Sequence, residues 1–196
     1  MATDFIAELE QQVPDFLEQV DEVLPFVKPY YADHVCWRTE TKQEYSDLIS
    51  SLKNYSRATL LIESIIGGRP IATFKLHDGI MCCSDRRSIN VLEIPSPKEG
   101  SPYPRGLEHV EFAIGLENSD ASPITPINDA THQYRLQTLM EEHPEIKSWN
   151  VKAKCKKINP DVSLKIELPT FGNCSVKFHL LPLESVIEYE SAHEMA

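Results

Sequence analysis

The sequence contains no apolar run long enough to cross a membrane, and its start lacks the features of a secretory signal. The first eight residues include Asp4 and Glu8, where a signal peptide needs basic residues followed by an apolar stretch. The sequence therefore predicts a cytoplasmic or nuclear protein with no membrane partner.

Cysteine is sparse and scattered. There are five cysteines, an odd number, and no two of them form a CxxC pair. This pattern does not fit a disulfide framework, so we expect reduced thiols. Cys36 is a candidate ligand or nucleophile, although an inert buried thiol is the commoner case.

Positive charge is also scarce. The chain has 19 Lys and Arg against 30 Asp and Glu, a net charge of −11, and it shows no basic stripe of the kind that binds phosphate backbones. The nearest candidates are Lys152, Lys154, Lys156 and Lys157, whose spacing is typical of the outward edge of a strand. The sequence predicts no nucleic-acid partner. Walker, Rossmann, HExxH and Gly-x-Ser-x-Gly motifs are absent too.

The N-terminal segment has helical spacing over residues 3–27. Phe5, Ile6 and Leu9 form one apolar stripe, and a second stripe follows after Pro14. Because proline favours the first turn of a helix, we expect a second helix to begin there. This helical segment, residues 1–30, is predicted to be a packing appendage.

The rest of the chain repeats one order of elements. Strands are predicted at 34–39, 58–66, 71–77 and 89–94, with a helix between the first two that begins at Thr39 or Thr41 and runs to about Asn54. Gly67 and Gly68 predict a hairpin turn. The order then recurs, with a strand at 107–114, a helix at 129–142, strands at 149–155, 163–168 and 174–181, and a terminal helix after Pro182.

The predicted fold is α+β, made of two βαβββ modules related by a pseudo-twofold axis around one curved-sheet pocket. The modules span residues 31–97 and 107–196, joined by a linker at 98–106. Each module has a helix on one face of its sheet only. Its other face needs a partner, which we expect the other module to provide.

Alternation places polar and apolar residues on opposite faces of these strands. His34, Cys36 and Arg38 share one face of the first strand, and His109 and Glu111 share the matching face of strand 107–114. Such a face can simply point to water. Its metal-ligand and acid–base residue types at matched positions favour a site instead.

Four residues are the candidate metal ligands. His34 and His109 open the first strand of each module, while Glu93 and His179 lie in the last strands. If the modules are related by a twofold axis, these side chains converge. Three imidazoles and a carboxylate suit zinc, iron, nickel, cobalt or manganese.

An ordered set of short motifs resembles the vicinal oxygen chelate superfamily, which includes glyoxalase, bleomycin-resistance and dihydroxybiphenyl dioxygenase proteins. The closer resemblance is to its YecM branch, described as related to isomerases and oxidoreductases. The motifs are Ala32-Asp33-His34-Val35, Gly68-Arg69-Pro70-Ile71, Phe74-Lys75-Leu76-His77, Val91-Leu92-Glu93-Ile94-Pro95, Tyr103-Pro104, Glu108-His109-Val110-Glu111, Asn159-Pro160 and Lys177-Phe178-His179.

The resemblance implies ligands on the first and last strands of each module, positions that fall on His34, Glu93, His109 and His179. Many members carry Glu at the last of these positions. Here Glu188 is the nearest alternative, but we place it in the terminal helix. The fold also implies a metal-dependent enzyme acting on a small oxygen-rich substrate, with isomerase, epimerase or lyase chemistry favoured. Ring-cleaving oxygenase chemistry would need iron. The alternative is a non-catalytic small-molecule-binding protein on the same scaffold.

Further residues have predicted roles around the ion. Glu111 lies about 7 Å along the strand from His109, too far to ligate the same ion easily, and is the candidate general base. The alternative for Glu111 is an ion pair with Lys177 or Arg38. Arg38, Arg69, Lys75 and His77 are candidate substrate-binding residues, with ordinary surface positions as the alternative. The oligomeric state does not follow from the sequence.

Overall fold

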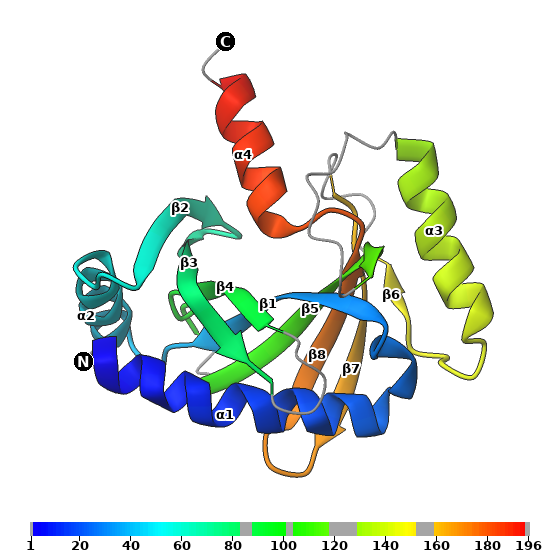
Figure 1. Ribbon diagram of the computed structural model, residues 1–196, viewed down its shortest axis with the longest axis horizontal. Helices are drawn as coiled ribbons and strands as arrows, with labels where there is room; N and C mark the ends of the chain where they lie inside the picture. The colour runs from blue at the N-terminus through cyan, green and yellow to red at the C-terminus, as the bar shows by residue number, and fades with distance from the viewer. Residues whose placement is uncertain (1, 83–87, 101–103, 118–128, 152–158, 195–196) are drawn as a thin grey trace.

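The computed structural model describes residues 2–82, 88–100, 104–117, 129–151 and 159–194 (Figure 1). The first half contains α1 (Ala2–Val23), a 3-10 helix η1 (Pro25–Val27), β1 (Tyr30–Arg38), α2 (Lys42–Lys53), β2 (Ala58–Ile66), β3 (Arg69–Met81) and β4 (Ser88–Pro95). The second half contains β5 (Gly106–Glu117), α3 (Asp129–Glu142), β6 (Asn150–Val151), β7 (Val162–Leu168), β8 (Gly172–His179) and α4 (Leu183–Glu194). The predicted α+β class and order of elements are confirmed. The predicted strand 149–155 is seen only as β6, because residues 152–158 lie outside the described part.

The strands form one open mixed sheet in the order β2-β3-β4-β1-β5-β8-β7-β6. The first half supplies one side of the sheet and the second half the other. They meet where β1 pairs with β5 antiparallel, and each of these two strands pairs with the last strand of its own half in parallel. The halves join edge to edge, which satisfies the backbone groups of two strands that would otherwise be exposed edges.

The N-terminal segment is a single helix, not the predicted two. Pro14 lies inside α1, where proline normally costs about 3 kcal/mol because it removes a backbone hydrogen bond and clashes with the preceding turn. The helix continues because its buried face is continuous through Leu9, Val13, Phe16 and Val20. Burial of that stripe against the sheet outweighs the local penalty.

The main hydrophobic core lies between the sheet and three helices. Buried side chains of α1, α2 and α3 form one cluster with apolar strand residues such as Val35, Trp37 and Phe112. The rings of Phe5 and Trp37 meet edge to face, with centroids 5.3 Å apart. In Figure 1, α1 runs along the bottom of the sheet. Because side chains alternate, the polar residues of β1 point to the opposite face.

The predicted turn at Gly67 and Gly68 and the predicted N-cap of α2 are both present. Gly67 and Gly68 have φ angles of 60° and 81°, the positive values that a two-residue hairpin turn requires. Of the two candidate caps for α2, Thr41 is the N-cap, and its side chain accepts a hydrogen bond from the backbone N–H of Glu44. Thr39 instead donates to the carbonyl of Pro95 on β4.

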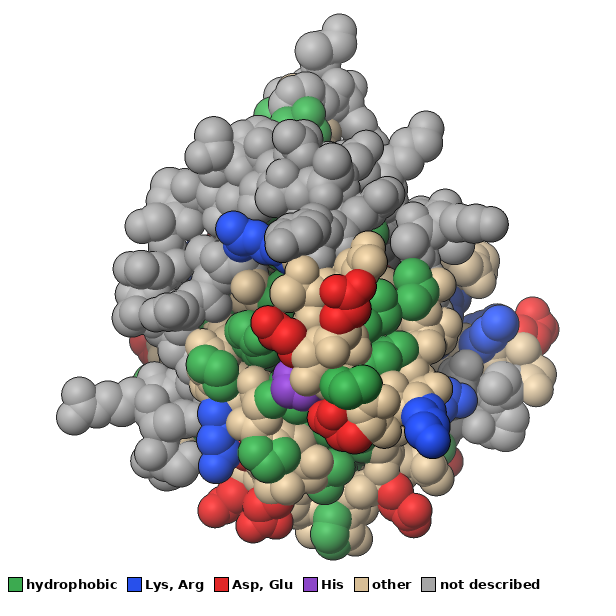
Figure 2. All heavy atoms as spheres, turned by 90° about the vertical axis from the view of Figure 1, so that its right-hand side faces the viewer, with side chains coloured by type: hydrophobic (Ala, Val, Ile, Leu, Met, Phe, Trp, Pro, Cys, Tyr) green, Lys and Arg blue, Asp and Glu red, His purple; other side chains and the backbone are tan. Residues whose placement is uncertain are grey.

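The polar strand face does not point to water. His34, His109, Glu111 and His179 are each at most 4% exposed, so their charges must be balanced within the protein. On the side of the molecule seen in Figure 2, the coloured Lys and Arg side chains are scattered among acidic and hydrophobic ones. None of the helices in the described ranges has the length and apolar character needed to span a membrane.

Candidate functional site

The candidate site lies where the four central strands β4, β1, β5 and β8 run side by side. Cys36 pairs with Glu93 on one side and with His109 on the other, and His34 lies opposite Glu111. On β8, Lys177 is the partner of Glu111. This register brings side chains from both halves of the chain onto one face at the centre of the sheet.

The carboxylate of Glu111 lies close to four other ionisable side chains of the site. Its Oε1 lies 3.3 Å from Nε2 of His34, 3.1 Å from Nε2 of His109 and 2.5 Å from Nζ of Lys177. Its Oε2 lies 3.8 Å from Nε2 of His179. The expectation from the spacing along the strand, that Glu111 lies too far from His109 to share an ion, is wrong, because their side chains bend toward each other and both also meet the cross-strand neighbour His34. Of the two ion pairs considered for Glu111, the one with Lys177 is present, whereas Arg38 pairs with Glu108 at 2.7 Å.

Two of the imidazoles are held by their Nδ1 atoms. Nδ1 of His34 lies 2.7 Å from Oδ2 of Asp33, which also accepts the backbone N–H of Leu183 at the start of α4. Nδ1 of His179 lies 2.5 Å from the carbonyl oxygen of Leu181. The Nε2 atoms of both rings are buried and make no hydrogen bond among the described residues, but each faces a carboxylate. Nε2 of His34 lies 3.3 Å from Oε1 of Glu111, and Nε2 of His179 lies 3.5 Å from Oδ2 of Asp33. These carboxylates offset part of the cost of burying the two ring nitrogens.

The charges of the cluster depend on one another. Burial opposes ionisation of Glu111, but Lys177 and His34 outweigh it and hold the pKa of Glu111 well below its ordinary value. Burial likewise opposes the charged form of His34, but Glu111 and Asp33 outweigh it and raise the pKa of His34 to about 10. For Glu93 the opposing burial is outweighed by His109, and the pKa falls to about 2. Both carboxylates are therefore ionised at neutral pH.

Several buried groups could hold a metal ion. His34, Glu93, His109 and Glu111 can each offer a ligand atom such that all four atoms lie within 4.8 Å of one another. Two smaller groups overlap this one: Asp33 with His34 and His179, and Cys36 with Glu108 and His109. Three of the four predicted ligands are thus brought together, and His179 lies in a neighbouring group that shares His34. Sequence reasoning missed Glu111 as a candidate ligand, and the signal that could have found it is cross-strand pairing with His34.

A cavity of about 570 Å³ opens beside the cluster. Among the residues that line it are Cys36, Glu93, His109, Glu111 and Lys177, together with Arg69 on β3 and Lys165 on β7. A cavity of this volume can hold a small molecule. Buried carboxylates and imidazoles on its wall give that molecule charged and proton-transferring neighbours.

The predicted substrate-binding residues separate in the structure. Arg69 lines the cavity, and its guanidinium donates to the carbonyl of Ser96. The described lining includes none of the other three predicted residues. Lys75 pairs with Glu184 of α4 at 2.5 Å, His77 is exposed beside Thr59, and Arg38 lines a different cavity next to α1.

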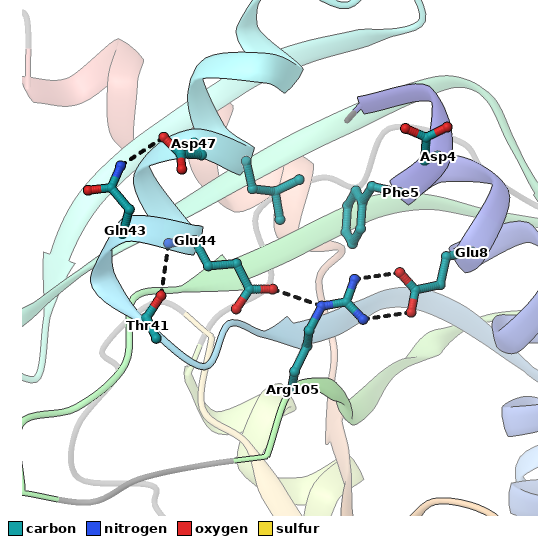
Figure 3. A pocket seen from close by; sticks show the side chains of 9 residues that line it. Asp4, Phe5, Glu8, Thr41, Gln43, Glu44, Asp47 and Arg105 are labelled. Atoms are coloured by element: carbon teal, nitrogen blue, oxygen red, sulfur yellow. Dashed lines mark hydrogen bonds and ion pairs between the residues drawn. The ribbon is translucent and has the colours of Figure 1, made fainter.

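Another cavity, of about 520 Å³ and distinct from the one that Arg38 lines, lies between α1 and α2 (Figure 3). Figure 3 shows the guanidinium of Arg105 between the carboxylates of Glu8 and Glu44. Arg105 also lies over the ring of Trp37, 4.8 Å from its centroid. This arrangement links α1 and α2 to the segment that leads into β5, which is a structural role.

Comparisons with known proteins agree with this fold. The model of the family described as "YecM protein" matches residues 3–190. Protein YecM of Escherichia coli (strain K12) is 24% identical over 199 residues, and the match covers 96% of this chain and 96% of that protein. The solved structure named "Structural Genomics, Protein EC4020" is similar with a TM-score of 0.65 and 24% identity, covering 94% of this chain and 92% of that one. The likeness to the solved structure supports the fold alone.

Proposed function

Because the chain belongs to the YecM protein family, as the sequence motifs predicted, we propose a function from the geometry of its own central site. The protein is a metal-dependent enzyme that acts on a small oxygen-rich substrate bound in the cavity beside Glu111. The observation that carries this proposal is the group His34, Glu93, His109 and Glu111, in which ligand atoms from three strands of both halves lie within 4.8 Å of one another and all residues but Glu93 are buried.

The donor set fits a divalent transition metal. His34 and His109 would supply imidazole nitrogen and Glu93 would supply carboxylate oxygen, a mixture suited to zinc, iron, nickel, cobalt or manganese. These three ligands, together with His179, leave positions open for a substrate on a metal with octahedral geometry. Asp33 supports this role, because it holds Nδ1 of His34 in the way that carboxylates orient metal-bound histidines and leaves Nε2 directed at the ligand group. His179 remains the proposed fourth ligand.

The remaining groups have roles that follow from their positions. A bound divalent ion would act as a Lewis acid on substrate oxygen. Glu111 is ionised and faces the cavity, so its carboxylate can accept a proton from a substrate carbon or hydroxyl and return it elsewhere. Such a transfer is the core of isomerase, epimerase and lyase reactions. Arg69, on the cavity wall, can bind an anionic group of the substrate.

The test is metal content. Purified wild-type protein should contain close to one equivalent of a divalent transition metal by elemental analysis, and His34→Ala and His109→Ala should each lose it. Both variants should also lose the increase in melting temperature that added metal gives the wild type. His77→Ala is the matched control, because His77 is an exposed histidine outside the cavity. Metal content of His179→Ala tests the fourth ligand. If Glu188→Ala loses metal and His179→Ala does not, Glu188 on α4 is the fourth ligand instead. Unchanged metal content in both His34→Ala and His109→Ala would overturn the proposal.

One observation favours the second candidate, a non-catalytic small-molecule-binding protein. Nζ of Lys177 lies 2.5 Å from Glu111 and 3.0 Å from Nε2 of His109, so the cluster already contains a cation. A protein that works without metal would bind an anionic ligand in the same cavity. Absence of metal from the purified protein, together with saturable binding of a small anion, would support this candidate.

We also propose that the halves are two βαβββ modules related by a pseudo-twofold axis, as in the vicinal oxygen chelate superfamily. The module bounds are the predicted ones, 31–97 and 107–196, with the linker at 98–106 and the helical segment at 1–30. The matching strand order outward from β1 and β5 supports this division. So does the register, because Val35 and Val110 pair with each other at the centre, with His34 and His109 each one residue before them.

A further inference from the structure

Lys177 stands in the second half where Glu93 stands in the first. Glu93 is the β4 partner of Cys36, two residues after His34, and Lys177 is the β8 partner of Glu111, two residues after His109. The next strand outward agrees, because Thr73 lies opposite Glu93 and Ser163 opposite Lys177. His179, which sequence reasoning matched with Glu93, is two residues further along β8. The place that corresponds to a ligand carboxylate is therefore occupied by an ammonium group.

The ammonium group contacts the atoms that a metal would use. Nζ of Lys177 lies 3.0 Å from Nε2 of His109 and 2.5 Å from Oε1 of Glu111. Nε2 of His109 in turn lies 3.5 Å from Oε2 of Glu93. An ammonium has three N–H donors and no lone pair, so it cannot be a ligand. In the tautomer that leaves a lone pair on Nε2, His109 can either accept a hydrogen bond from Lys177 or bind a metal ion through that lone pair, but not both.

We infer that the ammonium group of Lys177 competes with the divalent ion for His109 and Glu111 and so lowers the metal affinity of the site. This inference rests on the proposed function, because it concerns the same ligand group. Two positive charges a few ångströms apart in a buried site repel each other strongly. Metal binding therefore requires Nζ to move away from His109 and Glu111. The cavity gives it room, because Lys177 lines the cavity and its side chain is 20% exposed.

The test is the zinc affinity of Lys177 variants, measured by competition with a chromophoric chelator. Lys177→Met removes the charge and keeps an apolar stem of similar length. Lys177→Gln also removes the charge but keeps a donor for Glu111, so it serves if the Met variant does not fold, which circular dichroism will show. Lys177→Arg keeps the charge. Lys165→Met is the matched control, since Lys165 lines the same cavity from β7 and is exposed.

Removal of the charge should tighten zinc binding by at least about tenfold, because the repulsion between the two cations is lost. Lys177→Arg and Lys165→Met should stay close to the wild type. A gain of affinity is a readout that a purely structural lysine would not give. If the wild type binds zinc and neither neutral variant binds more tightly, the inference fails and the proposed function stands. If only the neutral variants bind zinc, the inference holds and the wild type is not a zinc enzyme. If no variant binds zinc, the inference fails, and the proposed function fails with it if elemental analysis finds no other divalent metal in the wild type.

Discussion

Glu111 of β5 lies opposite His34 of β1 across the central strand pair, with its Oε1 3.3 Å from Nε2 of His34. The two residues are 77 positions apart in the chain and come from different halves. Their pairing places an ionised carboxylate between three histidines and a lysine in a buried site. Most of the chemistry proposed for this protein depends on that one juxtaposition.

Replacement of Glu111 by Gln should remove the general base and leave the proposed ligands, His34, Glu93, His109 and His179, in place. We expect turnover to fall by roughly 100-fold or more, the usual range for loss of a positioned base, with metal content unchanged. The measurements are elemental analysis and turnover of the folded fraction, with any isomerase or lyase substrate found by screening.

The competing role of Glu111 is structural, as the counterion of Lys177 and His34. In that case Glu111→Gln would lower the free energy of unfolding while the folded fraction kept its activity. Loss of metal from Glu111→Gln would show instead that Glu111 is a ligand. Glu63→Gln is the control, because Glu63 is a strand carboxylate paired with Lys53 that lies outside the cavity and outside the ligand groups.

Replacement of Asp33 by Asn should loosen the orientation of His34. Asp33 is 1% exposed and accepts hydrogen bonds from Nδ1 of His34 and from the backbone N–H of Leu183. Carboxylates that orient a ligand histidine typically contribute about 10–100-fold to metal affinity, and we expect a loss in that range. Nitrogen NMR of the His34 ring, which reports which nitrogen carries the proton, should show a mixed tautomer in the variant. An unchanged ring spectrum would contradict the orienting role.

The ion pair between Glu8 and Arg105 should make stability depend on pH in acid. The hydrogen bond from Arg105 outweighs burial and holds the pKa of Glu8 below its ordinary value, so the stabilisation is present above the pKa of the unfolded chain. It is lost as the pH falls through the lower pKa of the folded state. Wild type should therefore exceed Glu8→Gln in unfolding free energy by up to about 1 kcal/mol at pH 7, and the difference should vanish once the pH lies below the pKa of Glu8 in the folded state. Urea unfolding at several pH values measures it.

Glu18→Gln is the control for that experiment, because Glu18 is an exposed carboxylate on the same helix. Its stability difference from wild type should be small and should change little with pH. A pH-independent difference for Glu8→Gln would mean that Arg105 is held by Glu44 and Trp37 without the help of Glu8.

The sequence by itself determined the local elements of this protein and their order. The helix at 129–142 and the strand at 58–66 have the predicted bounds, and Gly67 and Gly68 form the predicted turn. Periodicity and turn chemistry are properties of a few neighbouring residues, so they can be read from the chain alone. One prediction failed because a tertiary contact overrode a local rule. Packing of its buried face keeps α1 continuous through Pro14.

Only the tertiary structure decided which polar side chains meet. Alternation showed that His34, His109 and Glu111 lie on polar strand faces, but it carried no information about which residue would lie opposite each one. The register of β1 against β5 places Glu111 beside His34, and the register of β5 against β8 places Lys177 at the position matching Glu93. Register depends on the packing of the whole sheet and on irregularities such as the shift between Ala32 and His34. A shift of one residue would turn these side chains to the other face, so the composition of the site is a property of the assembled sheet.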